Sequence, residues 1–234
     1  GIQGPRHFLE GPFGYFSLID PDWDAREFAL LEQRHAMREL SHKPFPSGRA
    51  THGGVDGVLS LQAAHGFEVD AIREIRVLAP PLVIQLVDRP ATANMAASYA
   101  RLCLPYVAAT ALLRGTVDVE DFEPAALADP ARLQLAARTR VLRDGNPSLN
   151  ALSPQRVEVT LHDGGELAID LPAVLGAPGR PLERHRHLAK FRRAAASGLR
   201  PMSPEGVERV IQLVDDLPQL ADVRLLVDAL IVEP

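Results

Sequence analysis

The segment from Lys43 to Asp56 carries residue types that bind and polarise small carboxylic acids. Its sequence is Lys-Pro-Phe-Pro-Ser-Gly-Arg-Ala-Thr-His-Gly-Gly-Val-Asp, which brings Lys43, Arg49 and His52 within ten residues. The helical pattern that follows places this turn at a helix N-terminus, where free N–H groups and the helix dipole favour an anion. Arginine offers a carboxylate two parallel hydrogen bonds, and Gly53, which has no side chain, would let that carboxylate approach the backbone closely. These features predict a di- or tricarboxylate site, although spacing alone fits a solvated loop equally well.

Tyr106 is the second candidate for chemistry. The pattern of residues 105–114 predicts a helix that begins at Pro105. Proline has no backbone N–H, and it is tolerated at the first helical position because an N–H there would have no partner within the helix. Tyr106 would lie in the first turn, where it could donate to an anion or transfer a proton. The residues alone favour a core tyrosine with one satisfied hydroxyl. Cys103 has no evident base beside it, so we expect a buried structural cysteine.

Patterns for metals, cofactors and nucleic acids are missing from the sequence. His185 and His187 lie two residues apart on a predicted helix and face different sides, which is poor metal geometry. No C-x-x-C, H-E-x-x-H, G-x-G-x-x-G, P-loop or G-x-S-x-G pattern occurs. The net charge of -5 argues against a broad nucleic-acid surface. We therefore predict no metal, no cofactor and no nucleic-acid partner.

The same bulk properties bear on location. No apolar run reaches the ~20 residues of a membrane helix, which predicts no membrane partner. The single cysteine excludes an internal disulfide framework and is typical of the reducing cytoplasm.

Helical patterns dominate the two ends of the chain and alternate with extended segments in its middle. Thr51 and Ser203 are placed to cap helices, and Gly66 to end one. The predicted helices cover residues 51–65, 105–114, 182–196, 203–217 and 222–231, with helical character over 24–39 and short helices within 118–138. Residues 71–79 predict a strand, and the alternation over 156–171 around Asp163-Gly164 is a strong hairpin signal.

The order of these elements predicts an α+β unit inserted between two parts of a helical domain. We place the α+β domain at residues 43–175, and assign residues 1–42 and 176–234 to the helical domain. The apolar stripes of the tail helices need a partner helix layer. Because the sequence begins at Gly1 as if in the middle of a domain, we expect a fragment, a processed chain or one product of a split gene.

Several different short motifs follow one another along nearly the whole chain. They are Leu9-Glu10-Gly11 with Phe13-Gly14, Lys43-Pro-Phe-Pro, Thr51-His52, Leu104-Pro105-Tyr106, Leu112-Leu113-Arg114-Gly115, Asp121-Phe122, Asp163-Gly164, Pro181-Leu182 and Lys190-Phe191. Each motif is weak by itself, but the series resembles the C-terminal half of the MmgE/PrpD family. That family includes 2-methylcitrate dehydratase and cis-aconitate decarboxylase.

The resemblance implies a largely helical domain with an α+β domain, containing an antiparallel sheet, inserted late in the sequence. It also implies a metal-free active site between the domains, citrate-like substrates and a homodimer. Lys43 and Tyr106 match family active-site residues and His52 matches a recurrent histidine, so we predict these three as catalytic. Arg49 lies where members vary, and its role rests on its charge. Arg49, Thr51 and Gly53 are the predicted substrate-binding residues.

The function predicted from these features is a metal-independent lyase, a dehydratase that removes water from a citrate-like polycarboxylate. The family's other site residues lie upstream, so this chain is expected to supply the C-terminal half of the active site, with the upstream helical half as its partner. Decarboxylation and epimerisation or isomerisation of the same substrates are alternatives. A non-catalytic partner subunit is the alternative from another class.

Overall fold

The computed structural model describes residues 4–19, 22, 24, 26–30, 33 and 35–231, in two compact units, 1–40 and 41–234. The first unit contains α1 (Tyr15–Ile19), α2 (Arg26–Ala29) and the 3-10 helix η1 (Ala36–Glu39). The Phe16 ring lies 5.7 Å from Tyr15 and 5.6 Å from Phe28 in edge-on contacts. Helical character over 24–39 is thus confirmed at 26–29 and 36–39, whereas residues 25, 31, 32 and 34 lie outside the described part.

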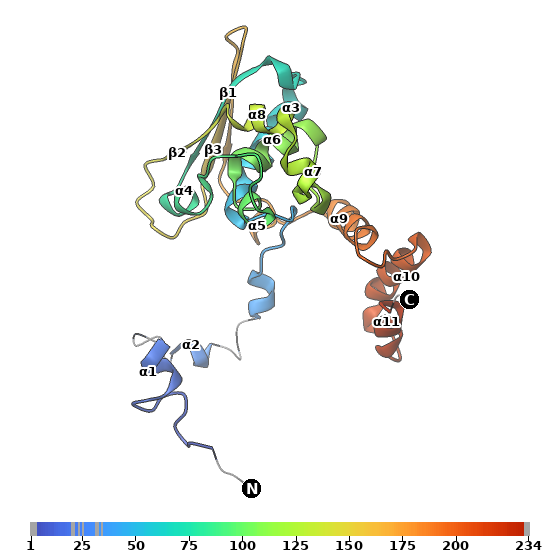
Figure 1. Cartoon of the computed structure of the whole chain (residues 1–234). Helices are drawn as coiled ribbons and strands as arrows, with labels where there is room; N and C mark the ends of the chain where they lie inside the picture. Colours follow the sequence, from blue (N-terminus) through green and yellow to red (C-terminus); the bar gives the residue numbers. More distant parts are fainter. Residues whose placement is uncertain are drawn as a thin grey trace. The chain divides into compact units, whose positions relative to one another are not determined.

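A four-stranded sheet in the order β2-β1-β3-β4 forms the centre of the second unit (Figure 1). The strands are β1 (Ile72–Ala79), β2 (Thr139–Arg143), β3 (Gln155–Leu161) and β4 (Glu166–Leu171). The β1/β3 and β3/β4 pairs are antiparallel, but β2 runs parallel to β1. The α+β class is confirmed, and the sheet is mixed rather than antiparallel throughout. The reason is that β2 follows β1 through a helical crossover, which returns the chain in the same direction.

The predicted strand and hairpin are both present. β1 covers most of the range 71–79, and β3 and β4 enclose the turn at Asp163-Gly164. Gly164 has a φ of 92°, a conformation that glycine adopts without strain. The Asp163 carboxylate accepts the Gly165 N–H at 2.9 Å, which fixes the turn.

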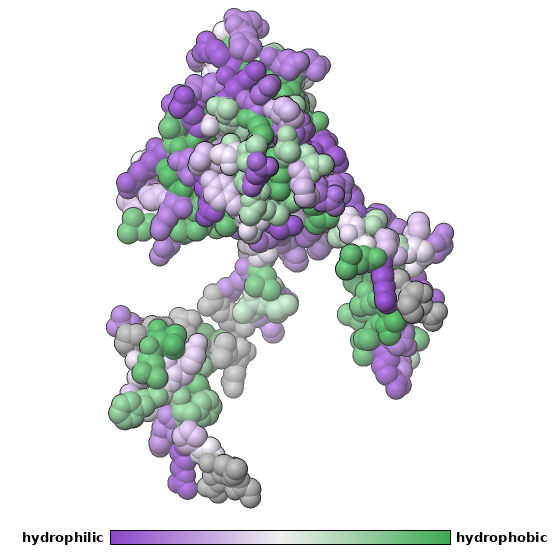
Figure 2. Space-filling view, viewed as in Figure 1, coloured by the Kyte–Doolittle hydropathy of each residue, from purple (hydrophilic) through white to green (hydrophobic). Residues whose placement is uncertain are grey.

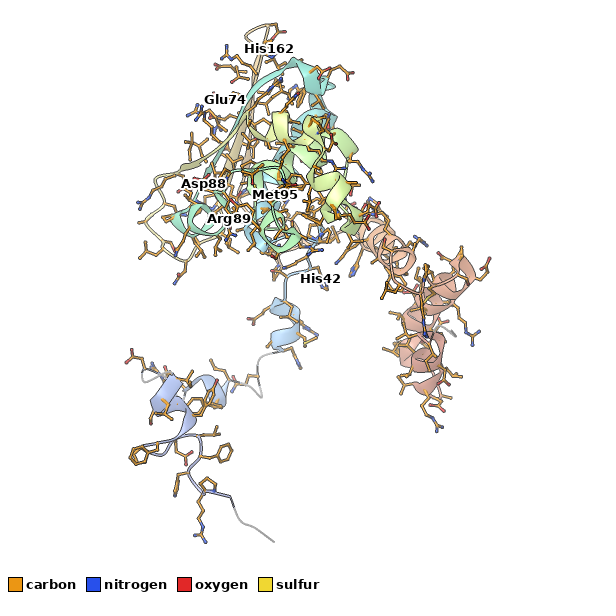
Figure 3. All side chains as sticks on the ribbon, in the orientation of Figure 1. His42, Glu74, Asp88, Arg89, Met95 and His162 are labelled. Atoms are coloured by element: carbon orange, nitrogen blue, oxygen red, sulfur yellow. The ribbon has the colours of Figure 1, made fainter. Side chains whose placement is uncertain are left out.

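The two faces of the sheet differ in polarity. One face buries Ile75, Val77, Val157 and Val159 under helices. Ion pairs cover the other face, with Arg76–Glu158 at 3.0 Å, Arg156–Asp170 at 2.9 Å and Arg140–Glu74 at 3.0 Å; Glu74 is labelled in Figure 3. Such exposed pairs stabilise a fold little, so the free energy of folding comes mainly from the apolar face.

Helices α3 (His52–His65) and α6 (Leu104–Arg114) contact the sheet and each other. Gly57 allows α3 to approach β3, because a Cβ there would lie 2.3 Å from Val157 Cγ2. Gly66 and Gly115 end the two helices with φ of 64° and 74°, as predicted for Gly66. Two 3-10 helices, η2 (Arg49–Thr51) and η3 (Val69–Ala71), precede β1. Besides α6, the crossover contains α4 (Pro81–Val87), α5 (Ala97–Ala100), η4 (Val119–Phe122), α7 (Pro124–Leu127) and α8 (Pro130–Ala136).

The tail forms the three predicted helices, α9 (Arg184–Ala196), α10 (Pro204–Asp215) and α11 (Arg224–Ala229), with η5 (Leu217–Gln219) between the last two. Ser203 caps α10 as expected, since its Oγ accepts the Gly206 N–H at 3.1 Å. Figure 2 shows hydrophobic surface along these helices. A groove of about 420 Å³ between α9 and α10 is lined mainly by Leu182, Leu188, Phe191, Val210, Ile211 and Val214. Within the described residues, no helix is long and apolar enough to cross a membrane.

Candidate active site

The turn before α3 is held together by its own hydroxyl groups. Lys43 Nζ donates to the Ser47 carbonyl at 3.3 Å, and Ser47 Oγ lies 2.8 Å from Thr51 Oγ1. Thr51 also donates to the Gly48 carbonyl at 2.8 Å and makes no side-chain cap of α3. The predicted cap is therefore wrong, because Thr51 is already helical (φ -78°, ψ -19°) as the last residue of η2. Its side chain is buried, and its substrate-binding role stays a prediction.

His52, the first residue of α3, is fully buried. The Phe45 ring packs edge-on against it at 5.6 Å. Neither ring nitrogen has a hydrogen-bond partner of normal geometry among the described residues. Buried polar groups without partners are costly and therefore rare, which makes this histidine a candidate for function.

The pKa of His52 is lowered to about 3, so the ring is neutral at neutral pH. Burial is the main cause, and the positive charges of Arg49, Lys43 and Lys190 act in the same direction, whereas the Ser47 backbone opposes them. The cations of the site are thus Lys43 and Arg49, with Lys190 near enough to affect the ring. A neutral imidazole can accept or donate a proton in a reaction, but it does not add positive charge.

A loop that follows β4 borders the site. Arg49 Nη1 donates to the Leu175 carbonyl at 2.9 Å, and Arg180 forms an ion pair with the buried Asp56 of α3. The His42 N–H donates to the Gly176 carbonyl at 2.9 Å. Gly176 has a φ of 86°, and a Cβ there would lie 1.9 Å from the His42 carbonyl oxygen. Only glycine fits this contact, which joins the start of the α+β domain to the loop that leads to α9.

Protein side chains occupy the space beside Gly53 and Gly54, the first two glycines of α3. A Cβ on Gly53 would lie 2.2 Å from Gln155 Oε1, and one on Gly54 would lie 2.7 Å from Leu104 Cδ1. The expectation that these glycines leave room for a carboxylate is therefore corrected, since they allow α3 to pack closely. A role of the Gly53 N–H in binding stays a prediction.

Lys43 and Arg49 have no carboxylate partner among the described residues, although many other arginines do. Lys43 is exposed and Arg49 is half-buried. Two unpaired cations next to a buried neutral imidazole form a site that a small anion can complete. We call Lys43, Arg49 and His52 the cationic site.

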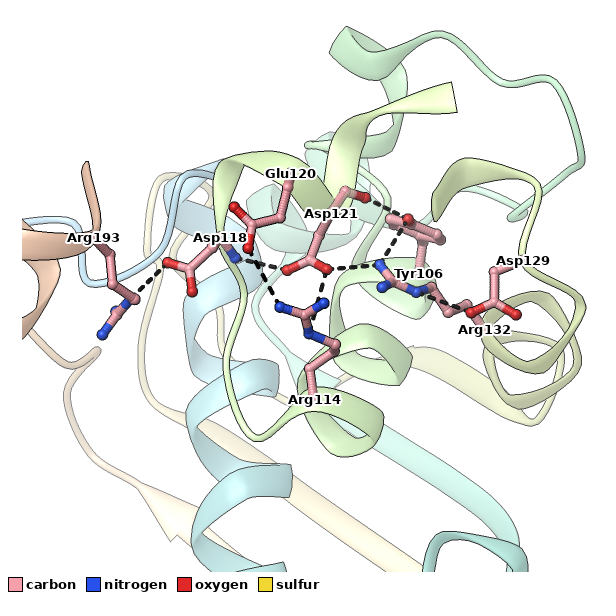
Figure 4. Close-up of polar contacts among 8 residues, drawn as sticks. All are labelled: Tyr106, Arg114, Asp118, Glu120, Asp121, Asp129, Arg132 and Arg193. Atoms are coloured by element: carbon pink, nitrogen blue, oxygen red, sulfur yellow. Dashed lines mark hydrogen bonds and ion pairs between the residues drawn. The ribbon is translucent and has the colours of Figure 1, made fainter. Parts of the chain in front are cut away.

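The structure places Tyr106 in a different network. Its buried hydroxyl donates to the Asp121 carbonyl at 2.5 Å and accepts from Arg132 Nη1 at 3.3 Å (Figure 4). Arg132 also pairs with the Asp121 carboxylate at 2.9 Å. Burial raises the pKa of Tyr106, which keeps the phenol protonated. Among the described residues, no hydrogen bond or ion pair joins Tyr106 to the cationic site, and its hydroxyl is satisfied within the core; its predicted catalytic role stays a prediction.

Cys103 is buried, and its Sγ donates to the Arg89 carbonyl at 3.1 Å. Burial raises the pKa of its thiol to about 11, which leaves it protonated at neutral pH. This agrees with the predicted structural role.

Replacing Tyr106 with phenylalanine should lower the free energy of unfolding by about 1–3 kcal/mol, because it leaves Arg132 and the Asp121 carbonyl with one partner fewer in the core. Urea unfolding measures this, with Tyr99→Phe as control. Tyr99 donates to Pro90 O at 3.1 Å in an exposed position, so its loss should cost less than ~1 kcal/mol. Unchanged stability of Tyr106→Phe together with lost turnover would instead assign the hydroxyl to catalysis.

The neutral, buried His52 should make folding stability depend on pH. Its folded-state pKa lies below the ordinary 6.5, so the unfolded chain takes up a proton that the folded chain does not. Stability is complete above pH 6.5 and is lost as the pH falls towards 3, by about 1.4 kcal/mol per pH unit at most. His52→Gln should flatten this slope in urea titrations at several pH values. His65→Gln, an exposed change at the end of α3, should keep it. Equal slopes in both variants would contradict the assignment.

Comparison with known proteins places this site in a family. Residues 45–217 match the model of the MmgE/PrpD C-terminal domain. The human (Homo sapiens) cis-aconitate decarboxylase is 27% identical over 97% of this chain and 47% of its own length. The mouse (Mus musculus) protein of the same name is 26% identical over the same shares. The chain spans about half the length of these relatives. Because the family match covers most of the sequence, the chain belongs to the MmgE/PrpD family and contains its C-terminal domain.

Proposed function

We propose that this chain supplies one part of the active site of a lyase that acts on a citrate-like polycarboxylate. The observation that carries the proposal is the pair of unpaired cations, Lys43 and Arg49, beside the buried and unpartnered His52. The family membership and the names of the two relatives support the reaction class. The proposal needs no metal, and among the described residues no group of three or more metal-ligating side chains lies together.

The chemistry that such a site serves is the stabilisation of a carbanion next to a carboxylate. A proton at that carbon is weakly acidic, so its removal builds a second negative charge on the substrate. Lys43 Nζ and the Arg49 guanidinium can neutralise that charge, and fixed cations of this kind often make the largest contribution to catalysis. The neutral His52 ring is suited to pass a proton once substrate binding gives its nitrogens a partner. The principal base is expected from the upstream part of the enzyme.

Three reactions share this intermediate. In dehydration, the reaction predicted from the sequence, the carbanion expels the neighbouring hydroxyl group as water and an alkene forms. In decarboxylation, which the names of the relatives favour, a C–C bond breaks, carbon dioxide leaves and the carbanion takes up a proton. In epimerisation the carbanion is reprotonated on its other face. Lys43 and Arg49 would serve each of them.

The partner that we propose is the upstream helical half of the enzyme, either in the same polypeptide or in a separate one. The tail helices expose apolar side chains, including Val214, Leu217, Val223, Val227 and Ile231. Apolar surfaces of this kind are typical of interfaces. A homodimer and a cytoplasmic location are further parts of the proposal, the latter because the single cysteine is free.

Proton NMR in heavy water tests the reaction. The chain, alone and mixed with its upstream half, is incubated with 2-methylcitrate, citrate, cis-aconitate and iminodisuccinate. A new alkene signal from a hydroxy acid means dehydration, itaconate means decarboxylation, and deuterium exchange alone means epimerisation. Activity only in the mixture supports a divided site. No change with any substrate favours the non-catalytic subunit.

A further inference from the structure

Lysine is rare in this chain, and the charges of both lysines lower the pKa of His52. Lys43 and Lys190 are the only lysines in the sequence, and every other basic residue besides histidine is an arginine. They lie 147 positions apart, one before α3 and one on α9. Both nevertheless act on the charge state of His52. A lysine offers a compact ammonium on a flexible stem, whereas arginine offers a wide planar fork.

The orientation of α9 places Lys190 towards the cationic site. Residues three apart on a helix lie on neighbouring parts of its surface, so Lys190 falls between His187 and Arg193. The His187 ring lies 5.0 Å from that of His42, the neighbour of Lys43. Arg193 Nε donates to the Asp118 carboxylate at 2.8 Å, as Figure 4 shows. Because the residues on both sides of Lys190 contact the α+β domain, Lys190 faces that domain too.

A small cavity lies along the same face of α9. It has a volume of about 220 Å³, and its lining includes Pro44 and Phe45 on one side and Arg186, Ala189 and Arg193 on the other. Phe45 is the residue whose ring covers His52. Lys190 is half-buried and has no hydrogen-bond or ion-pair partner among the described residues. Lys190 and the three residues of the cationic site do not line this cavity, which shows that α9 and the turn at Pro44 and Phe45 enclose a common space.

The Arg193–Asp118 ion pair holds α9 in this position. Asp118 and Asp121 form the capping box of η4. The Asp118 carboxylate accepts the Asp121 N–H, and the Asp121 carboxylate accepts the Asp118 N–H. These two hydrogen bonds hold Asp118 in place. The Asp121 carboxylate in turn forms an ion pair with the buried Arg132. The neighbouring Arg192 points elsewhere, because it pairs with Glu208 of α10 at 2.6 Å within the tail. Arg193 is therefore the arginine that connects α9 to the α+β domain.

We propose that Lys190 binds a second carboxylate of the polycarboxylate held by Lys43 and Arg49, and that Arg193 is a positioning residue that keeps α9 in place for it. This inference rests on the proposed function and makes it specific. On this proposal, a substrate with two separated carboxylates contacts the turn and α9 together, whereas a monocarboxylate contacts the cations of one of them only. Lys190 would then select for chain length and charge of the substrate.

Lysine-selective NMR tests this directly. Reductive ¹³C-dimethylation keeps the positive charge of each lysine and labels only Lys43, Lys190 and the N-terminal amine. The variants Lys43→Arg and Lys190→Arg each remove one signal and thereby assign all three. Titration with tricarballylate, an unreactive tricarboxylate, should shift both lysine signals with the same saturation curve and leave the amine signal in place. Lys190→Gln should weaken the binding about tenfold, as loss of one charge-assisted contact does.

The outcomes separate the two proposals. A saturating shift of Lys43 with none of Lys190 overturns the role of Lys190 and leaves the proposed function standing. No saturating shift of either lysine overturns both. Arg193→Gln should reduce the response of Lys190 while that of Lys43 persists, and Arg192→Gln is the matched control that should change neither. Equal effects of the two arginine variants would remove the positioning role of Arg193.

Discussion

Replacing Lys43 with alanine should lower kcat/KM for a citrate-like polycarboxylate by about 10²–10³-fold, the usual cost of removing one fixed group that stabilises developing charge. Lys43 is exposed, and its ammonium makes one hydrogen bond, of 3.3 Å, to the Ser47 carbonyl. Its loss should therefore change the free energy of unfolding by less than ~1 kcal/mol. Steady-state kinetics of the complete enzyme and urea unfolding of the variant measure the two quantities.

The matched control for this change is Arg73→Ala. Arg73 is an exposed cation on β1, far along the chain from the turn at Lys43, and its removal changes the net charge by the same amount. Turnover by this variant should equal that of the unchanged protein. If Lys43→Ala retains near-normal turnover, or if both variants lose activity equally, Lys43 does not stabilise the reacting group.

Replacing Arg132 with alanine should produce the largest loss of stability, about 3–5 kcal/mol, because it leaves a buried charge without its partner. The Asp121 carboxylate is 1% exposed, and Arg132 Nη1 lies 2.9 Å from it. The next cation, Arg114, reaches the carboxylate only at 3.8 Å. Arg132 also donates to the Tyr106 hydroxyl and lies near Asp129, so its loss disturbs α6 and α8 together. Denaturant midpoints report the change.

Arg140→Ala provides the comparison. Arg140 pairs with Glu74 at 3.0 Å, but its side chain is 70% exposed, and surface pairs of this kind contribute only ~0–1 kcal/mol. Similar unfolding midpoints for Arg132→Ala and Arg140→Ala would show that the Asp121 network does not stabilise the domain.

The elements that the sequence predicted best are those with a local signal. Three features depend only on residues a few positions apart: the end of α3 at Gly66, the turn at Asp163-Gly164 and the Ser203 cap of α10. Their hydrogen bonds form between near neighbours, so residue type alone identifies them. The tail helices were predicted for the same reason, from apolar residues at helical spacing.

The elements that were missed depend on distant partners. β2 is a five-residue edge strand separated from the end of α8 by only two residues, Ala137 and Arg138, neither of which is a residue type typical of turns. Its burial alternates from Thr139 to Val141, which is a weak signal, and its parallel pairing with β1 is a property of the crossover. Thr51 had the correct residue type for a cap, but η2 extends the helical backbone through it and its hydroxyl bonds to Ser47 instead.

In the candidate site, too, groupings within one segment could be predicted, whereas contacts between distant segments could not. The grouping of Lys43, Arg49 and His52 was visible because they lie in one segment; the charges of Lys43 and Arg49 act on the buried His52 ring, and the roles of all three stay predictions. That the Tyr106 hydroxyl is bound within the core follows from Asp121 and Arg132, which the sequence does not place beside it. Lys190 could be found only from tertiary contacts, because α9 reaches the site through His42 and Asp118. In the sequence, Lys190 is marked by its rarity as a residue type and by its place in the Lys190-Phe191 motif.

Calorimetric titration of the full chain with tricarballylate tests most directly whether Lys43 and Arg49 form a polycarboxylate site. We expect saturable binding at one site, weakened at least tenfold in Arg49→Gln and unchanged in the exposed control Arg73→Ala, since each lost charge-assisted contact costs roughly 1.5–3 kcal/mol. Binding that is absent, or that the two variants weaken equally, would contradict it, because general attraction of an anion to positive charge would then be sufficient.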